Sequence, residues 1–179
     1  MERPLLIATG AVGVAWLAIS ASTLFPALKP KAATSKRLTR AQVSDLVRQI
    51  DITRFGGWFS NAPRRHSDVV AVIKIESNYE TGAIGDNGKA HGLGQMHAAA
   101  AGDMGFTLQD LHDPYNAVLA AMKYLKWIWD TLTNWLRKTP SLTQWIGSYN
   151  AGVGNVSGRN GGVFIPLSYV NRWKSAAGR

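Results

Sequence analysis

Cysteine is absent from the 179 residues of this chain, so disulfide bonds and thiolate metal sites are excluded. Acidic residues are few: 11 Asp and Glu stand against 20 Lys and Arg, and the formal charge is +9 at pH 7. This charge suits an anionic partner such as nucleic acid, acidic lipid or bacterial cell wall. No nucleic-acid-binding motif accompanies it, so we do not expect nucleic acid. The four histidines have no regular spacing, and we expect neither a metal nor a cofactor.

Long hydrophobic runs are also absent, with one exception at the N-terminus. Residues 5–28 form 24 consecutive positions without a charge, which is long enough to span a bilayer as a helix. We therefore predict a transmembrane helix that anchors the chain, with residues 1–28 as the anchor segment. The alternative is a cleaved secretory signal ending near Ala18-Ile19-Ser20, but the run is longer than an ordinary signal core. Residues 29–40 carry five basic and no acidic side chains and are predicted to be a linker.

The remaining sequence, residues 41–179, has the pattern of one predominantly helical domain. Apolar residues recur at three- and four-residue steps, and capping patterns begin at Thr39, Thr107, Asp113 and Ser141. Five glycines between residues 78 and 97 indicate a loop with a hairpin near Asp86. We predict a mainly α or α+β fold with a very small sheet. We expect a first helix that begins near Thr39 and a helix that begins after Ser141. Further helices are expected over residues 67–77, 98–104, 113–136 and 166–174.

One helix combines an apolar face with a carboxylate. Val69, Val72 and Ile73 precede Glu76 by seven, four and three residues, so all four share a face. A carboxylate turned toward a core loses hydration, which raises its pKa from about 4.3 toward about 6. Glu76 is therefore a candidate general acid. The alternative is a buried ion pair with a Lys or Arg, which has a structural role.

Three separated motifs line up with that carboxylate. They are Ile75-Glu76-Ser77, the segment Gly92-Leu-Gly-Gln-Met96, and the segment Ser148-Tyr-Asn-Ala-Gly152. In this order and spacing they resemble the catalytic domain of soluble-type lytic transglycosylases, which are relatives of goose-type lysozyme. The resemblance runs from about residue 66 to residue 173 and includes Tyr169-Val170. It implies a lysozyme-like fold.

The resemblance also implies roles for five residues. Glu76 would be the catalytic acid and base, and Ser77 would orient it or contact the sugar. Gln95 would bond acetamido or hydroxyl groups of the substrate, Tyr149 would place its hydroxyl against the Glu76 carboxyl, and Asn150 would bond the sugar beside the cut. Other interpretations stay open for three of them: Ser77 as an ordinary helix-terminal residue, Tyr149 as core, and Asn150 as a helix cap.

The chain also departs from the resembled pattern. Members commonly carry Gly-Leu-Met-Gln followed by a hydrophobic residue and Met-Pro, whereas here Gly94 replaces the Met and His97-Ala98 replaces the Met-Pro. A second carboxylate would be needed by an ordinary glycosidase, and Glu80 and Asp86 are the candidates. In the resembled family one Glu suffices.

The function expected from the resemblance is that of a lytic transglycosylase acting on peptidoglycan. It would cleave the β-1,4 bond between N-acetylmuramic acid and N-acetylglucosamine, form 1,6-anhydro-N-acetylmuramic acid, and open the wall locally. We expect a membrane-anchored enzyme in the periplasm, serving a phage virion or a secretion machine. Basic residues after a span usually stay cytoplasmic, which conflicts with that topology. The alternatives are a hydrolytic muramidase and an inactive peptidoglycan-binding or virion-assembly protein.

Overall fold

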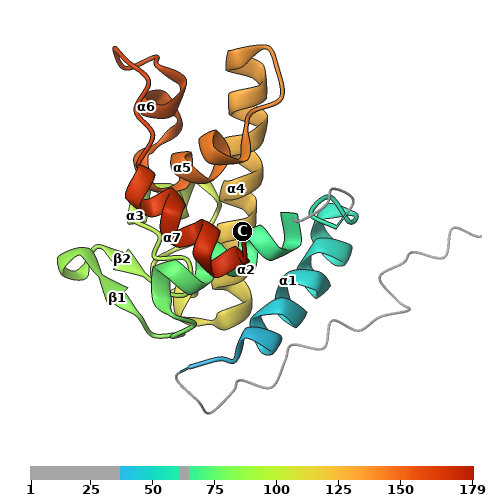
Figure 1. The fold of residues 1–179 in the computed structure, drawn as a ribbon. Coiled ribbons are helices and arrows are strands. Elements are labelled where there is room, and N and C mark those ends of the chain that lie inside the picture. Colours follow the sequence, from blue (N-terminus) through green and yellow to red (C-terminus); the bar gives the residue numbers. More distant parts are fainter. Residues whose placement is uncertain (1–36, 61–64) are drawn as a thin grey trace, which may run out of the picture.

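The computed structural model describes residues 37–60 and 65–179 (Figure 1). The predicted anchor or signal at residues 5–28 and the first part of the predicted linker lie outside the described residues. Among the residues that are described, no helix is both long and apolar enough to cross a membrane.

The described chain is mainly helical and carries one very small antiparallel sheet, which confirms the predicted class. The sheet pairs Ile84 with His91 and Gly85 with Ala90. The elements in chain order are α1 (Arg40–Phe55), α2 (Arg65–Ser77), β1 (Ile84–Gly85), η2 (Asp86–Gly88), β2 (Ala90–His91), α3 (Ala98–Asp103), η3 (Asp110–His112), α4 (Pro114–Leu136), α5 (Leu142–Ala151), α6 (Val153–Ser157) and α7 (Leu167–Ala177).

Local capping chemistry sets several of these boundaries. The side-chain oxygens of Thr39 and Ser141 accept from the backbone N–H of the Gln three residues on. The side chain of that Gln accepts from the backbone N–H of Thr39 or Ser141, so both predicted capping boxes form. Asp113 caps α4, with Pro114 in its first turn. The helix predicted over residues 67–77 begins two residues earlier than expected, because α2 already begins at Arg65.

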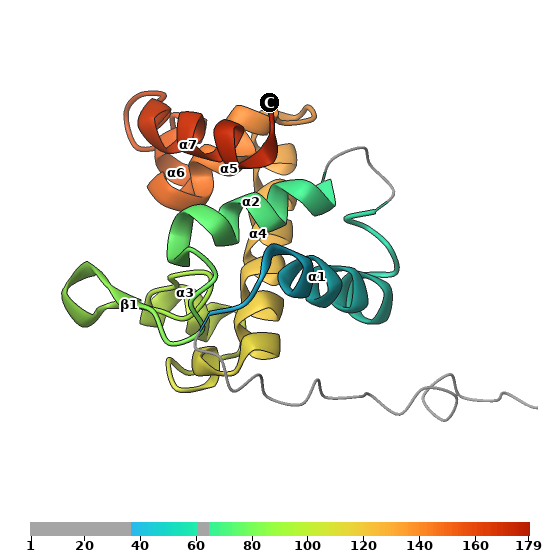
Figure 2. The ribbon, with the colours of Figure 1, turned by 60° about the horizontal axis from the view of Figure 1, so that its bottom comes forward.

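The long helix α4 is the element around which the others are packed. It contacts α1, α2, α5, α6 and η3, while α2 lies between α1 and α7 (Figure 2). Trp145 of α5 is fully buried and donates its indole N–H to Leu125 O of α4 at 2.8 Å. Because α2 is enclosed on several sides, its apolar residues form the centre of the core and its C-terminal turn is held in place.

Residues just before position 41 also pack against the helical domain. Leu38 is buried, and its N–H donates to Tyr79 O at 2.9 Å. Arg37 pairs with Glu80 in an isolated antiparallel bridge. The end of the predicted linker is therefore fixed against the segment that follows α2.

Candidate active site

Glu76 lies in the last turn of α2, on the apolar face that the sequence predicted. Val69, Val72 and Ile73 have no exposed surface, and Glu76 is partly buried. The pKa of Glu76 is raised from 4.5 to about 7, because the effect of burial outweighs the lowering effects of the Tyr169 hydrogen bond and the Arg172 charge. A carboxyl with this pKa is present in both protonation states at neutral pH. It can therefore both donate and accept a proton there.

The hydroxyl that contacts this carboxyl comes from α7. Tyr169 donates to Glu76 Oε1 at 2.5 Å, and α7 packs along α2, which brings the two residues together. Burial and the nearby Glu76 charge raise the pKa of Tyr169 well above its ordinary value, so its hydroxyl keeps its proton. The sequence-based assignment gave this contact to Tyr149, whose hydroxyl instead bonds Gly94 O, and a role of Tyr149 beside the Glu76 carboxyl stays a prediction. The Tyr169-Val170 pair could have indicated this contact, because it is part of the family resemblance, but the resemblance assigned no function to Tyr169.

Tyr149 instead supports the glycine-rich loop. Its hydroxyl donates to Gly94 O at 2.8 Å. Burial, followed by the Glu76 charge, raises the pKa of Tyr149 well above 10, so this side chain lies within electrostatic reach of the acid. A Cβ at Gly94 would lie 2.8 Å from the Tyr149 hydroxyl and 3.0 Å from Ala121 Cβ. The glycine that replaces the usual Met therefore leaves the space that the Tyr149 hydroxyl occupies.

Gln95 also holds the loop. Its backbone is left-handed, with φ 46°, and its side-chain Nε2 donates to Ala83 O and Gly92 O, both at 3.0 Å. Both amide hydrogens are thus engaged by the protein. Its Oε1 lies against Gly85, where an added Cβ would come within 2.3 Å. The bonds from Gln95 to substrate that the resemblance implied stay a prediction.

Ser77 and Asn150 are placed differently from each other. Ser77 is buried, and its Oγ donates to Ile73 O at 3.2 Å, which is the backbone bond expected of a helix-terminal Ser. Asn150 lies exposed in the last turn of α5, and the C-cap of that helix is Gly152, with φ 82°. Asn150 is thus accessible to a ligand and is not the helix cap. The substrate contacts predicted for both residues stay predictions.

The two candidate second carboxylates lie on the loop between α2 and α3. Asp86 is about half exposed, and its Oδ2 lies 3.1 Å from His97 Nε2. Glu80 is partly buried, and its backbone forms the isolated bridge with Arg37. Within residues 37–60 and 65–179, no group of three or more His, Cys, Asp or Glu is placed to hold a metal ion.

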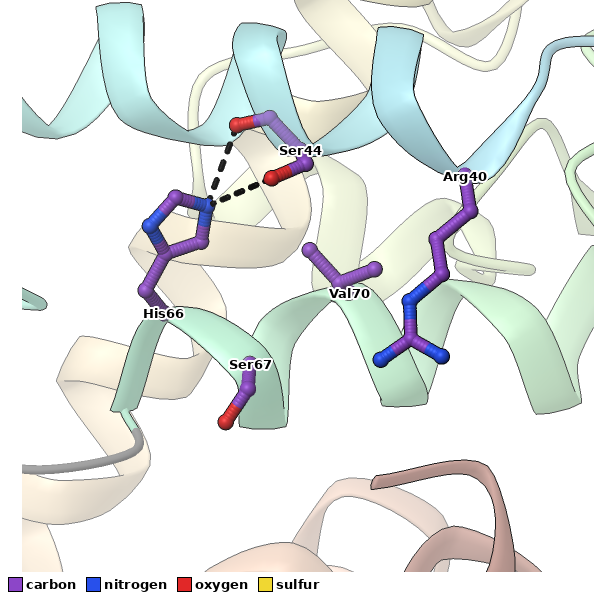
Figure 3. A pocket seen from close by; sticks show the side chains of 5 residues that line it. All are labelled: Arg40, Ser44, His66, Ser67 and Val70. Carbon is purple, nitrogen blue, oxygen red and sulfur yellow. Dashed lines mark hydrogen bonds between the residues drawn. The ribbon is translucent and has the colours of Figure 1, made fainter. Parts of the chain in front are cut away.

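A separate hollow of about 430 Å³ lies between α1 and α2. Figure 3 shows His66 reaching from α2 to α1, where its Nε2 lies 3.0 Å from Ser44 O and 3.4 Å from Ser44 Oγ. Arg40, Ser67 and Val70 complete the lining. Glu76 does not line this hollow, so the chemistry proposed below is not located there.

A comparison with protein-family models gives one match, described as a transglycosylase SLT domain, over residues 61–163. No curated protein and no solved structure matches the chain. The matched segment contains Glu76, the glycine-rich loop and Tyr149, and it ends before Tyr169. Because it covers more than half of the chain, the protein belongs to the family of transglycosylase SLT domains, which implies a peptidoglycan lytic transglycosylase.

Proposed function

We propose that the protein cleaves the β-1,4 bond between N-acetylmuramic acid and N-acetylglucosamine and leaves a 1,6-anhydro-N-acetylmuramic acid end. Glu76 acts as both the acid and the base. One observation carries the proposal: a partly buried carboxyl, joined to a tyrosine hydroxyl, has a pKa of about 7. A catalytic group with a pKa near the working pH can transfer a proton in both directions.

In the first step, protonated Glu76 donates its proton to the glycosidic oxygen as the bond from that oxygen to C1 breaks. The acetamido group on C2 of the substrate stabilises the positive charge that develops at C1. Tyr169 donates to Oε1, so the proton that is transferred resides on Oε2. The hydroxyl thereby fixes which oxygen of Glu76 faces the substrate.

In the second step, the C6 hydroxyl of the same sugar attacks C1, and the Glu76 carboxylate takes the proton from that hydroxyl. The anhydro ring closes and Glu76 returns to its protonated form. A hydroxyl already held beside the reacting carbon has a high effective concentration compared with bulk water. This route needs no second carboxylate, which agrees with the exposed, His-paired position of Asp86.

We propose further that Ser77, Gln95, Tyr149 and Asn150 form the glycan site around Glu76. Ser77 and Gln95 support it through hydrogen bonds to the backbone. Tyr149 holds the loop in position through its hydrogen bond to Gly94 O. The exposed Asn150 is the one of these four best placed to donate directly to a sugar.

The domain is proposed to act outside the cytoplasm, where peptidoglycan lies, with residues 5–28 holding it to the membrane. Membrane fractionation followed by N-terminal sequencing tests the anchor: a mature N-terminus near Ala21 would show a cleaved signal. An association with a virion or a secretion machine stays a prediction from the sequence alone.

The experiment that tests the reaction is mass analysis of the products. The full chain, purified in mild detergent, is incubated with isolated cell-wall sacculi. We expect soluble muropeptides whose new ends are lighter by one water than free reducing ends. Free reducing ends would identify a hydrolytic muramidase, and binding to sacculi without release of soluble products would identify an inactive wall-binding protein.

A further inference from the structure

One large aromatic side chain of α4 is left at the surface. Trp127 is 42% exposed, whereas Trp145 and Trp173 are buried. The indole of Trp127 is stacked on the ring of Tyr124, with centroids 5.6 Å apart and planes inclined by 10°. Tyr124 therefore packs against one face of the indole in an offset stack. The exposed part of the indole is a flat apolar surface.

This surface is connected to the surroundings of the acid by a row of aromatic rings. Tyr124 contacts Tyr149 edge to face, with centroids 5.4 Å apart and planes at 65°. Tyr149 bonds the Gly94 loop and lies within electrostatic reach of Glu76. The row Tyr149, Tyr124 and Trp127 thus runs from the proposed site to the surface of α4. We call it the aromatic row.

The position of Trp127 along α4 explains why its side chain is exposed to solvent. Tyr124, Trp127, Thr131 and Trp135 follow one another at three- and four-residue steps, so they share one stripe of the helix. Tyr124 packs against the α3 side of the molecule together with Met104 and Phe106.

At the other end of the stripe, the Arg159 guanidinium lies 4.5 Å from the Trp135 ring. In Figures 1 and 2, α3 and α6 lie on the same side of α4 but at different levels. The exposed part of the stripe lies between these two covered ends.

The two lysines beside the row are engaged by the protein, and the acidic Asp103 lies near Tyr124. Lys126 forms an ion pair with Asp130 at 2.7 Å, and Lys123 donates to Met104 O at 2.9 Å. The surface at Trp127 therefore offers stacking more than attraction for an anion. A neutral ligand with one flat apolar face and a polar rim matches these properties.

We propose that Trp127 is a sugar-stacking residue that extends the glycan site beyond the sugars at the cut. The ligand is an N-acetylated pyranose ring of the same glycan strand, with its C–H face against the indole. Aromatic rings bring large apolar area and an electron-rich face, which suits polarised C–H groups. The inference rests on the proposed function, because the strand is held by the same site as the scissile bond.

The test is a kinetic comparison of Trp127→Ala with wild type in the full chain, using soluble uncross-linked peptidoglycan strands. A contact made equally in the ground state and the transition state contributes to KM and not to kcat. We expect KM to rise about tenfold, equivalent to about 1.4 kcal/mol, with kcat within about twofold of wild type. Trp127→Phe, which keeps an aromatic face, should stay within about threefold of the wild-type KM.

Ile52→Ala is the matched control, because Ile52 is 64% exposed on α1 and lies outside the aromatic row. Its KM should equal that of wild type, and thermal unfolding should show that all variants are folded. If wild type cuts the strands and Trp127→Ala keeps the wild-type KM, the stacking role is wrong and the proposed function stands. A fall in kcat at unchanged KM would also overturn it.

Removing the stem peptides from the strands distinguishes a sugar contact from a peptide contact. The tenfold difference in KM should persist on peptide-free strands, and its loss would refute the sugar as the ligand. If wild type neither binds nor cuts any strand, the proposed function fails and the stacking role fails with it.

Discussion

Replacing Tyr169 by Phe separates the structural account of the acid from the account that the sequence suggested. The change removes one hydroxyl and leaves the ring packed between α7 and α2. In wild type that hydroxyl donates to Glu76 Oε1 at 2.5 Å and lowers the pKa of Glu76, opposing the effect of burial. Without it, the pKa of Glu76 should rise above about 7.

The magnitude follows from the two protonation states of the carboxyl. A hydrogen bond to a charged group contributes about 1.5–3 kcal/mol, and one to a neutral group about 0.5–1.5 kcal/mol. The difference, about 1–1.5 kcal/mol, corresponds to a rise of about one pKa unit. The alkaline limb of the pH–rate profile should move upward by about that amount. The rate itself should fall about tenfold, because the carboxyl loses the group that orients it.

The assay is the pH dependence of kcat/KM on soluble peptidoglycan strands, which reports ionisations of the free enzyme. Tyr149→Phe is the matched control. It removes the bond to Gly94 O and should destabilise the loop by about 1 kcal/mol without moving the alkaline limb. A shifted limb in Tyr149→Phe together with an unshifted limb in Tyr169→Phe would refute the contact described here.

Three further predictions concern groups around the site. The pKa of Glu76 is higher in the folded protein, about 7, than its ordinary value of 4.5. The contribution of the protonated carboxyl to stability is therefore complete below pH 4.5 and is lost as the pH rises through 7. Glu76→Gln should therefore stabilise the fold at pH 8 by up to about 3 kcal/mol and little at pH 4, and urea unfolding at both pH values checks this. Asp86→Asn should leave the cutting rate within about twofold, since Asp86 is exposed and paired with His97. Abolished cutting with free reducing ends would make Asp86 the base of an inverting muramidase. Gly92→Ala should cost about 3 kcal/mol, because its Cβ would lie 2.2 Å from Leu111 O at φ 70°; an unchanged thermal midpoint would contradict this.

Features that depend on neighbouring residues could be predicted from the sequence. The capping boxes at Thr39 and Ser141 form because their partners stand three residues away. Helical periodicity alone placed Glu76 on the apolar face of α2. The same local reasoning did not find α6, because Gly152 ends α5 with φ 82° and the five residues after it carry no amphipathic signal.

Features that depend on distant residues could not be predicted in this way. Tyr169 and Glu76 are 93 positions apart, and their contact follows from the packing of α7 on α2. Tyr149 shares the apolar face of its own helix, so its pattern was compatible with a bond to Glu76 or to the loop. The left-handed backbone of Gln95, and with it the inward direction of its amide, also depends on the folded loop.

The most direct test of the central claim is the cutting activity of Glu76→Gln on isolated sacculi. The substitution keeps the side-chain volume and an oxygen that can accept from Tyr169, and it removes the transferable proton. Because general acid catalysis contributes about 10²–10⁴-fold, we predict a loss of at least about a hundredfold, with thermal unfolding showing an intact fold. Activity within about threefold of wild type, less than about 1 kcal/mol of barrier, would show that Glu76 is not the acid.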